Sequence, residues 1–271
     1  MSERCDAALA LVEAPPTGEN VQPMHSDLFD STIPFGEPEL MRASSYGRYL
    51  EQLARDSTRT VTGTRLALLS PSLQADLLRF EEDGSGSEVI EVMAACLRHA
   101  ASLTIHLQCG DRVVPLTVFS RERLVHCPIG LGELVERHLA DVRVMHVEPT
   151  PLRPPGDPRR AWVGASHLYQ PLTPLLWELA MRGPRGDLLP EISGPAVYRV
   201  APALETAELL TIGVLKPAIE RLREQPANLA EIASWPELGR ERASRLLNGL
   251  YLQAGLIVSR SHPDAVRSGW A

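Results

Sequence analysis

The clearest periodic pattern in the chain lies near its C-terminal end. Six apolar residues recur there at helical intervals, at Ala243, Leu246, Leu247, Leu250, Tyr251 and Ala254. This spacing places them on one face of an α-helix, so the sequence predicts a helix from about Arg240 to Ala254. A shorter apolar group predicts a helix just before it, at Leu229, Ile232 and Ala233. That first helix is expected to break at Trp235-Pro236, because proline restricts the residue before it.

A cap and a strand are expected after the second helix. Gly255 lies where a left-handed residue commonly ends a helix, and the apolar run at residues 256–258 predicts a short β-strand. Helix, turn, helix and strand, in this order, form the core of a winged helix. We therefore expect a winged-helix-like arrangement over residues 228–260.

The hydrophobic period changes from 3.6 to 2 between residues 103 and 128. Leu103, Ile105 and Leu107 alternate with polar residues, and Gly110-Asp111 predicts a turn into a second strand at residues 113–119. Pro115 indicates that this second strand is an edge strand or carries a bulge. Residues 123–127 predict a third strand, so the three together form a β-meander.

Helices are expected on both sides of this meander in the sequence. One begins near Pro38, one runs from Ser70-Pro71 to Phe80, and one follows Ser87 with a buried stripe of Val89, Met93, Cys96, Leu97 and Ala100. Further elements are predicted as a strand at 60–69, a helix at 131–139, a strand at 142–147, a helix at 173–181, a strand at 196–200 and a helix at 212–223.

These elements predict an α+β fold in two domains. Residues 1–36 are rich in proline without a period and are expected to be disordered. Residues 37–150 form a mixed α/β domain with the meander, and residues 151–164 form a linker, because five prolines fall within residues 149–160. Residues 165–262 form a mainly helical, winged-helix-like domain, and residues 263–271 form a tail.

Charge is distributed unevenly along the chain. The net charge is −7; residues 1–100 carry 8 basic and 16 acidic side chains, whereas residues 203–271 carry 8 of each. A basic footprint typical of nucleic-acid binding is therefore missing from the sequence, and nucleic acid is an unfavoured partner. No apolar run has the length of a membrane span, and the first residues do not match a signal peptide, so we expect a cytoplasmic protein.

Candidate chemistry is limited to histidines and cysteines in or beside the predicted strands. His106 and Cys109 are three residues apart, and His126 and Cys127 are adjacent, so each pair faces opposite sides of a strand. This disfavours a metal site or a cysteine–histidine pair, although His106 and His126 could still meet on one face. The sequence contains no recognisable catalytic or nucleotide-binding motif. We therefore expect no cofactor, no metal and no enzymatic activity.

The predicted second helix carries polar residues opposite its apolar face. These are Arg240, Arg242, Arg245 and Asn248, and they form a candidate interaction face. In a DNA-binding protein they would contact bases and phosphates. Alternatively, they form an ordinary solvated helix face balanced by Glu237 and Glu241.

The segment LAEIASWPELGRERASRLLNGLYLQAGLIVSR resembles the winged-helix tails of bacterial regulatory proteins. A weaker resemblance covers Phe119 to Asp157, where FSRERLVHCP and VEPTPLRPPGD are similar to bacterial methyltransferase regulatory domains. The glycine-rich cofactor loop of that family's catalytic part is missing here, so this resemblance implies a regulatory module without the methyltransferase. Phrases such as VVPLTVF are also similar to uncharacterised proteobacterial proteins.

Together these features predict a non-enzymatic regulatory or adaptor protein that binds another protein through its winged-helix domain. The first alternative is a DNA-binding transcription regulator. The second is a small metal- or thiol-dependent enzyme that uses His106, Cys109, His126 and Cys127.

Overall fold

The structure is a computed structural model, and it describes residues 40–57, 69–83, 88–137, 139, 141–204 and 215–261. The chain divides into two units, Met1–Pro38 and Glu39–Ala271, and all the described residues belong to the second. The predictions for residues 1–36 and for the tail at residues 263–271 lie outside the described residues, as does the predicted strand at residues 60–69 except for Leu69.

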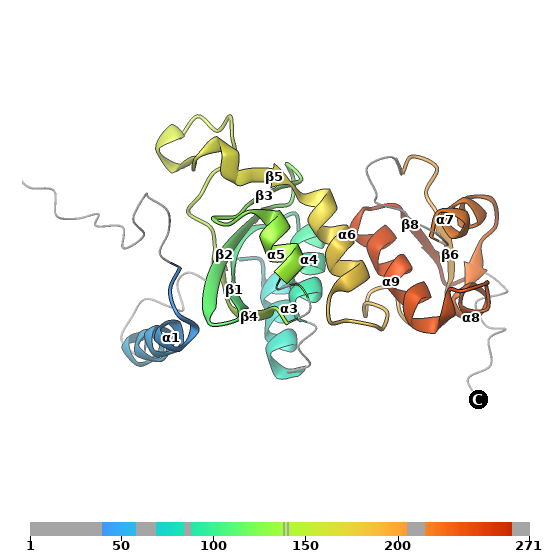
Figure 1. The fold of residues 1–271 in the computed structure, drawn as a ribbon, viewed down its shortest axis with the longest axis horizontal. Coiled ribbons are helices and arrows are strands. Elements are labelled where there is room, and N and C mark those ends of the chain that lie inside the picture. The colour runs from blue at the N-terminus through green and yellow to red at the C-terminus, as the bar shows by residue number, and fades with distance from the viewer. Residues whose placement is uncertain are drawn as a thin grey trace, which may run out of the picture. The chain divides into compact units, whose positions relative to one another are not determined.

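Helices and strands both contribute to the described part of the chain, which confirms the expected α+β class (Figure 1). The α-helices are α1 (Ala43–Ser57), α3 (Pro71–Asp83), α4 (Glu88–Arg98), α5 (Leu131–Arg137), α6 (Leu172–Arg182), α7 (Leu215–Glu224), α8 (Leu229–Ala233) and α9 (Gly239–Leu252). The strands are β1 (Ser102–Cys109), β2 (Arg112–Phe119), β3 (Leu124–His126), β4 (Arg143–Pro149), β5 (Tyr169–Pro171), β6 (Val197–Val200), β7 (Ala227–Asn228) and β8 (Leu256–Ser259). None of these helices combines the length and the apolar character needed to cross a membrane.

A five-stranded antiparallel sheet forms the first layer, in the order β4-β1-β2-β3-β5. Strands β1, β2 and β3 follow one another directly, so the predicted meander is confirmed. Pro115 was expected to mark an edge strand or a bulge, but β2 is an interior strand of this sheet and its register with β1 is continuous through Pro115. The short β3 pairs with β2 only at residues 117–119, so the ladder on that side does not reach Pro115.

The two faces of this sheet differ in character. Leu103, Ile105 and Leu107 of β1 are buried beside Val114, Leu116 and Val118 of β2. Figure 1 shows α4, α5 and α6 on one side of the sheet and α1 on the other. Side chains of α4, α5 and α6 complete the hydrophobic core on the first side, which we call the inner face. The opposite side is the outer face.

Helix α1 begins five residues later than expected. We predicted a start near Pro38, but the Met41 carbonyl accepts a hydrogen bond from the Val113 nitrogen. The backbone of Arg42 also forms an antiparallel β-bridge with Arg112. These contacts hold residues 41 and 42 extended beside the start of β2. The helix can therefore begin only at Ala43, and its Tyr46 is buried against the outer face.

The C-terminal part of the chain adds three helices and a three-stranded sheet of order β7-β6-β8. Asn228 caps α8 by accepting a hydrogen bond from the Glu231 nitrogen, while the Glu231 side chain accepts one from the Asn228 nitrogen. This reciprocal capping satisfies two backbone donors that would otherwise lack partners at the helix start. The expected helix, turn, helix and strand are all present, as α8, α9 and β8.

The end of α9 differs from the prediction. The left-handed residue is Ala254, with φ 56°, and not Gly255. The nitrogen of Gly255 donates to the carbonyl of Leu250 and closes the helix. A Cβ at Gly255 would lie 2.5 Å from a methyl carbon of Leu204. Close packing against Leu204 therefore favours glycine at this position, and the left-handed turn falls one residue earlier.

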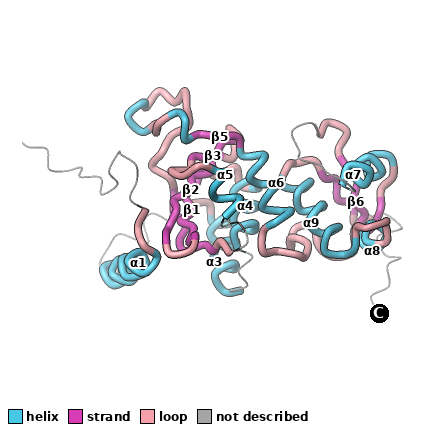
Figure 2. The backbone as a smooth tube through the Cα atoms, in the orientation of Figure 1, coloured by secondary structure: helices cyan, strands magenta, loops and turns pink. Residues whose placement is uncertain are grey.

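Residues 151–164 are not an extended linker between two separate bodies. Figure 2 shows residues 150–168 as loop interrupted by short helical turns, which are Arg160–Trp162 and Ser166–Leu168. After this segment, β5 pairs with β3 and so completes the first sheet. Helix α6 then contacts α4 and α5 as well as α9. The sheet therefore extends into the segment that we had assigned to the second domain.

Candidate functional site

The four polar residues of the predicted interaction face do not share one environment. Arg240 and Arg242 lie in the exposed first turn of α9, and Arg242 donates to the Glu237 carbonyl. Arg245 is half-buried, and Asn248 is completely buried. The prediction of one solvent-facing surface is therefore wrong for Arg245 and Asn248.

Helix α6 explains this difference, because it packs along the side of α9 that we had expected to face solvent. Arg245 Nη1 donates to the carbonyl of Gly183 at 2.8 Å and lies 3.3 Å from those of Ala180 and Met181. A cation at this position satisfies carbonyl groups at the end of α6 that lack helical partners. Arg245 therefore caps a neighbouring helix.

Asn248 joins α9 to the segment that follows α6. Its Oδ1 accepts a hydrogen bond from the Leu189 nitrogen, and its Nδ2 donates to the Asp187 carbonyl, both at 2.9 Å. A buried amide is stable in a protein interior only when such partners are present. Asn248 thus holds residues 187–189 against α9 and is not available for contact with another molecule.

The approach of α6 to α9 is close at Gly249. A Cβ at this position would lie 2.9 Å from ring carbons of Trp177 and 3.1 Å from the methyl carbon of Met181. Trp177 is only 2% exposed. Glycine in a helix interior is less favourable than alanine by about 1 kcal/mol, so its presence inside this helix is a local signal of close helix packing.

The histidines and cysteines lie on opposite faces of the five-stranded sheet, as their spacing predicted. Cys109 and Cys127 are buried with the inner-face residues, whereas His106 and His126 alternate with them and are less buried. Strand β2 separates His106 on β1 from His126 on β3, and the two histidines are also offset along it, so they lie more than about 10 Å apart. They do not meet, although they share one face.

His106 has partners that the sequence analysis missed. Its Nε2 lies 3.0 Å from Glu148 Oε1 on β4, and the ring of Tyr46 stacks on it with centroids 5.0 Å apart. The ring of His146 lies beside it at 5.9 Å. The alternation of β1 placed His106 on the outer face, but the pairing of β1 with β4 could not be read from local sequence. This group joins α1, β1 and β4.

His126 lies in a second group on the same face. The Tyr169 ring meets it edge-on at 4.9 Å, and a Cβ at Gly164 would lie 2.8 Å from its Nε2. Burial, together with the nearby His167, lowers the pKa of His126 below its usual value. His126 is therefore neutral at neutral pH, because burial disfavours the charged imidazole, and it packs against the loop that contains Gly164.

The thiols are poorly suited to nucleophilic chemistry. Burial raises the pKa of Cys109 to about 12 and that of Cys127 to about 11. Arg123, a cation close to Cys127 in the sequence, instead donates to the Leu252 carbonyl and to Gln253 Oε1 at the end of α9. Across the described ranges, no three histidine, cysteine, aspartate or glutamate side chains form a group that could hold a metal ion.

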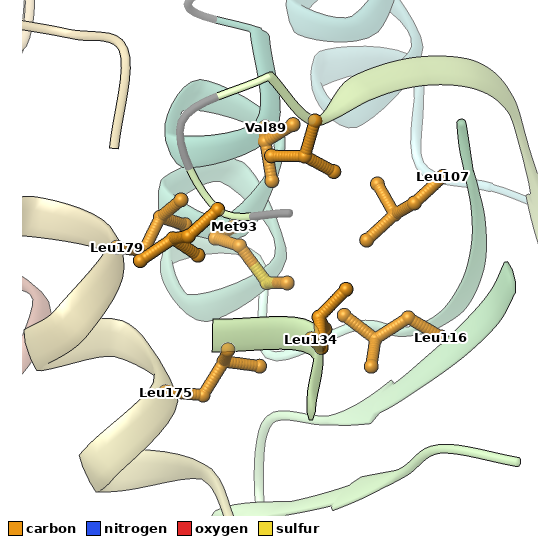
Figure 3. A pocket seen from close by; sticks show the side chains of 9 residues that line it. Val89, Met93, Leu107, Leu116, Leu134, Leu175 and Leu179 are labelled. Carbon is orange, nitrogen blue, oxygen red and sulfur yellow. The ribbon is translucent and has the colours of Figure 1, made fainter. Parts of the chain in front are cut away.

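A small apolar hollow lies in the core between α4, α5, α6 and the inner face of the sheet (Figure 3). Met93, Leu116, Leu134 and Leu175 point toward it, together with Val89, Leu107, Leu139, Val142 and Leu179. No polar side chain lines this hollow, so it offers nothing that could orient a polar substrate. It is a place where the core is incompletely filled.

Ion pairs across the core are a further feature that the sequence analysis missed. Arg98 on α4 pairs with Asp76 on α3 and with Glu191 on the segment before β6. Arg185 pairs with Glu91, which is only 4% exposed. The charges were visible in the sequence, but Arg98 and Glu191 lie 93 residues apart and Arg185 and Glu91 lie 94 apart, so these two pairs leave no local signal. These pairs fasten the chain after α6 to α3 and α4.

The chain was compared with known proteins in three ways. It matches no model of a protein family, no curated protein and no solved structure.

Proposed function

We propose that this chain is a non-enzymatic regulatory or adaptor protein of the cytoplasm, which acts by binding another protein and carries a winged-helix-like C-terminal region. The observation that carries the proposal is the position of α6. Helix α6 and the segment that follows it contact Arg245, Asn248 and Gly249, and so occupy most of the helix face with which a DNA-binding winged helix would read bases. Helix α9 thus contributes to internal packing with this face, and an adaptor would bind its partner through other surfaces.

The surroundings of the titratable groups support a non-enzymatic role. Cys127 is buried, its pKa is raised, and His126 points to the opposite face of the sheet. An activated thiol needs a lowered pKa and a base within hydrogen-bond reach, and neither is present for Cys127. The apolar hollow of Figure 3 contains none of the polar groups that catalysis requires.

One observation favours a second candidate function, the DNA-binding regulator. Arg240 and Arg242 are exposed in the first turn of α9, and recognition helices contact bases through their N-terminal residues. Against this stands the small number of cations, since Glu237 and Glu241 lie beside the two arginines.

A DNA titration separates the two functions. Fluorescence anisotropy with labelled duplex DNA is measured at several salt concentrations for the wild type and for Arg240→Ala/Arg242→Ala. The adaptor function predicts weak binding, of the non-specific strength of about 10⁻⁴ M or weaker, that the double substitution hardly changes. Tight binding that falls steeply with salt and is lost in the double variant would establish the regulator function.

Alkylation of Cys127 tests the enzyme alternative. A pKa of about 11 in place of 9.0 reduces the thiolate fraction at neutral pH by about 100-fold, so iodoacetamide should react slowly with the folded protein and normally after denaturation. Cys127→Ala provides the control that assigns the labelled site. Rapid and selective labelling of native Cys127, or one bound metal ion per chain, would place this protein among enzymes.

A further inference from the structure

Residues 150–168, which we call the Trp162 loop, connect opposite edges of the five-stranded sheet. The loop leaves β4 at one edge and enters β5 at the other, so it has to pass over three strands. In Figure 1 its middle part, coloured yellow-green, projects beyond β3 and β5. This connection between β4 and β5 is much longer than most connections between elements, which have about four to six residues.

The base of the loop is fixed by hydrogen bonds. Tyr169 Oη donates to the Arg153 carbonyl at 2.7 Å and accepts from the Gly164 nitrogen at 2.9 Å. The Arg153 nitrogen donates to the carbonyl of Trp162 at 2.9 Å. Tyr169 itself belongs to β5 and packs against Phe119 of β2. One tyrosine of the sheet therefore holds both arms of the loop.

The side chains at the tip of this loop face solvent. Trp162 is 51% exposed, and Arg159 and Arg160 beside it are also exposed. Tryptophan and arginine are the residues that most often dominate the energy of protein interfaces. Because the backbone that carries Trp162 is already ordered, little further conformational entropy would be lost on binding.

The loop also differs in charge from the chain as a whole. It carries three arginines and one aspartate, whereas the net charge of the chain is −7. A basic and aromatic tip on an acidic protein is complementary to a surface that has an apolar pocket and carboxylates around it. Three arginines are few for nucleic acid, which requires a continuous basic surface.

We propose that the Trp162 loop docks this protein onto another protein, which receives the Trp162 indole in an apolar pocket bordered by aspartate or glutamate side chains. This inference rests on the proposed adaptor function and names the surface that performs it. Trp162 supplies the buried contact, while Arg159 and Arg160 pair with the surrounding carboxylates. Arg153 and Tyr169 are positioning residues of the loop.

The partner is identified by photo-cross-linking in cells of the source organism. Full-length protein carries p-benzoylphenylalanine in place of the exposed Ala161, which leaves Trp162 intact. A second form carries the same group in place of Arg240, on the first turn of α9. The proteins captured from each position are identified by mass spectrometry, and the protein captured at position 161 is purified for direct titration.

The binary titration decides the proposal. We expect Trp162→Ala to weaken the Kd by about tenfold or more, and Arg159→Glu/Arg160→Glu to weaken it and to reduce its dependence on salt. Leu78→Ala, at a residue that is 58% exposed on α3, should leave the Kd within about twofold. Unchanged thermal denaturation of each variant shows that the fold is intact.

Four outcomes would overturn the proposal. They are a Kd for Trp162→Ala within twofold of the wild type, capture of nucleic acid only, capture of a second copy of this chain only, and no capture at position 161. If a protein is captured at Arg240 and not at position 161, the adaptor function stands and the docking loop is wrong. If no protein is captured at either position, both fail.

Discussion

Helix α9 and the Trp162 loop both differ from what their sequences indicate. The polar side of α9 is partly buried, and the loop is fixed to the sheet. The polar residues of α9 predict a surface, yet Asn248 is buried against residues 187–189. The proline-rich loop predicts an extended, semi-rigid linker between two domains, yet hydrogen bonds hold it against the sheet and it presents Trp162 to solvent. Polarity alone therefore does not identify a surface, because a buried amide with two good partners is as polar as an exposed one.

The largest expected effect concerns the apolar face of α9. Leu250 is fully buried, so Leu250→Ala should lower the free energy of unfolding by about 2–5 kcal/mol, measured by urea denaturation. Ile257→Ala is the matched control, because Ile257 is 46% exposed on β8 and its loss should cost about 0.5 kcal/mol or less. Equal costs for the two variants would mean that α9 is not the centre of a core.

Asn248→Ala probes the polar side of the same helix. The substitution leaves the buried Leu189 nitrogen and Asp187 carbonyl without their partner, so we expect a loss of about 1–3 kcal/mol in urea denaturation. Arg242→Ala, two turns earlier on α9 and exposed, should cost little. If Asn248→Ala is as harmless as Arg242→Ala, the original prediction of an exposed polar face is right.

A smaller effect on stability is expected from pH, through the ion pairs of Arg98 with Asp76 and Glu191. Burial alone would raise the pKa of Asp76, but hydrogen bonds from His99 and Arg98 outweigh it and hold the pKa below its ordinary value of 3.8. A lowered folded-state pKa means that the stabilisation is fully present above pH 3.8 and is lost as pH falls through the folded-state pKa. Denaturation midpoints measured between pH 7 and pH 2 should therefore fall more steeply for the wild type than for Asp76→Asn. Parallel curves would show that Asp76 has no such coupling.

Much of the fold could be predicted from local sequence, because periodicity reports directly on the buried face of an element. The alternation of Leu103, Ile105 and Leu107 predicted β1 and its inner face, and the spacing of Leu246 and Leu250 predicted the core side of α9. The meander followed because its turns are short. These features depend on residues that are close in the sequence.

The rest depends on contacts between distant segments, which leave no periodic signal. The pairing of β5 with β3 requires a long loop between β4 and β5, and nothing in the three residues of β5 indicates their partner. The packing of α6 on α9 similarly could not be read from α9, which has a normal amphipathic pattern. Gly249 was the one local signal, and it indicates a close neighbour without identifying it.

The two tryptophans Trp162 and Trp177 allow the comparison to be tested in one measurement. Trp162 is 51% exposed on the loop, whereas Trp177 is 2% exposed between α6 and Gly249 of α9. Hydroxyl-radical footprinting with mass spectrometry reads the oxidation rate of both side chains in the same sample of native protein. We expect rapid oxidation of Trp162 and far slower oxidation of Trp177, with equal rates after denaturation. Equal rates in the native protein would contradict it, because α9 would then be open along the side that α6 is said to close.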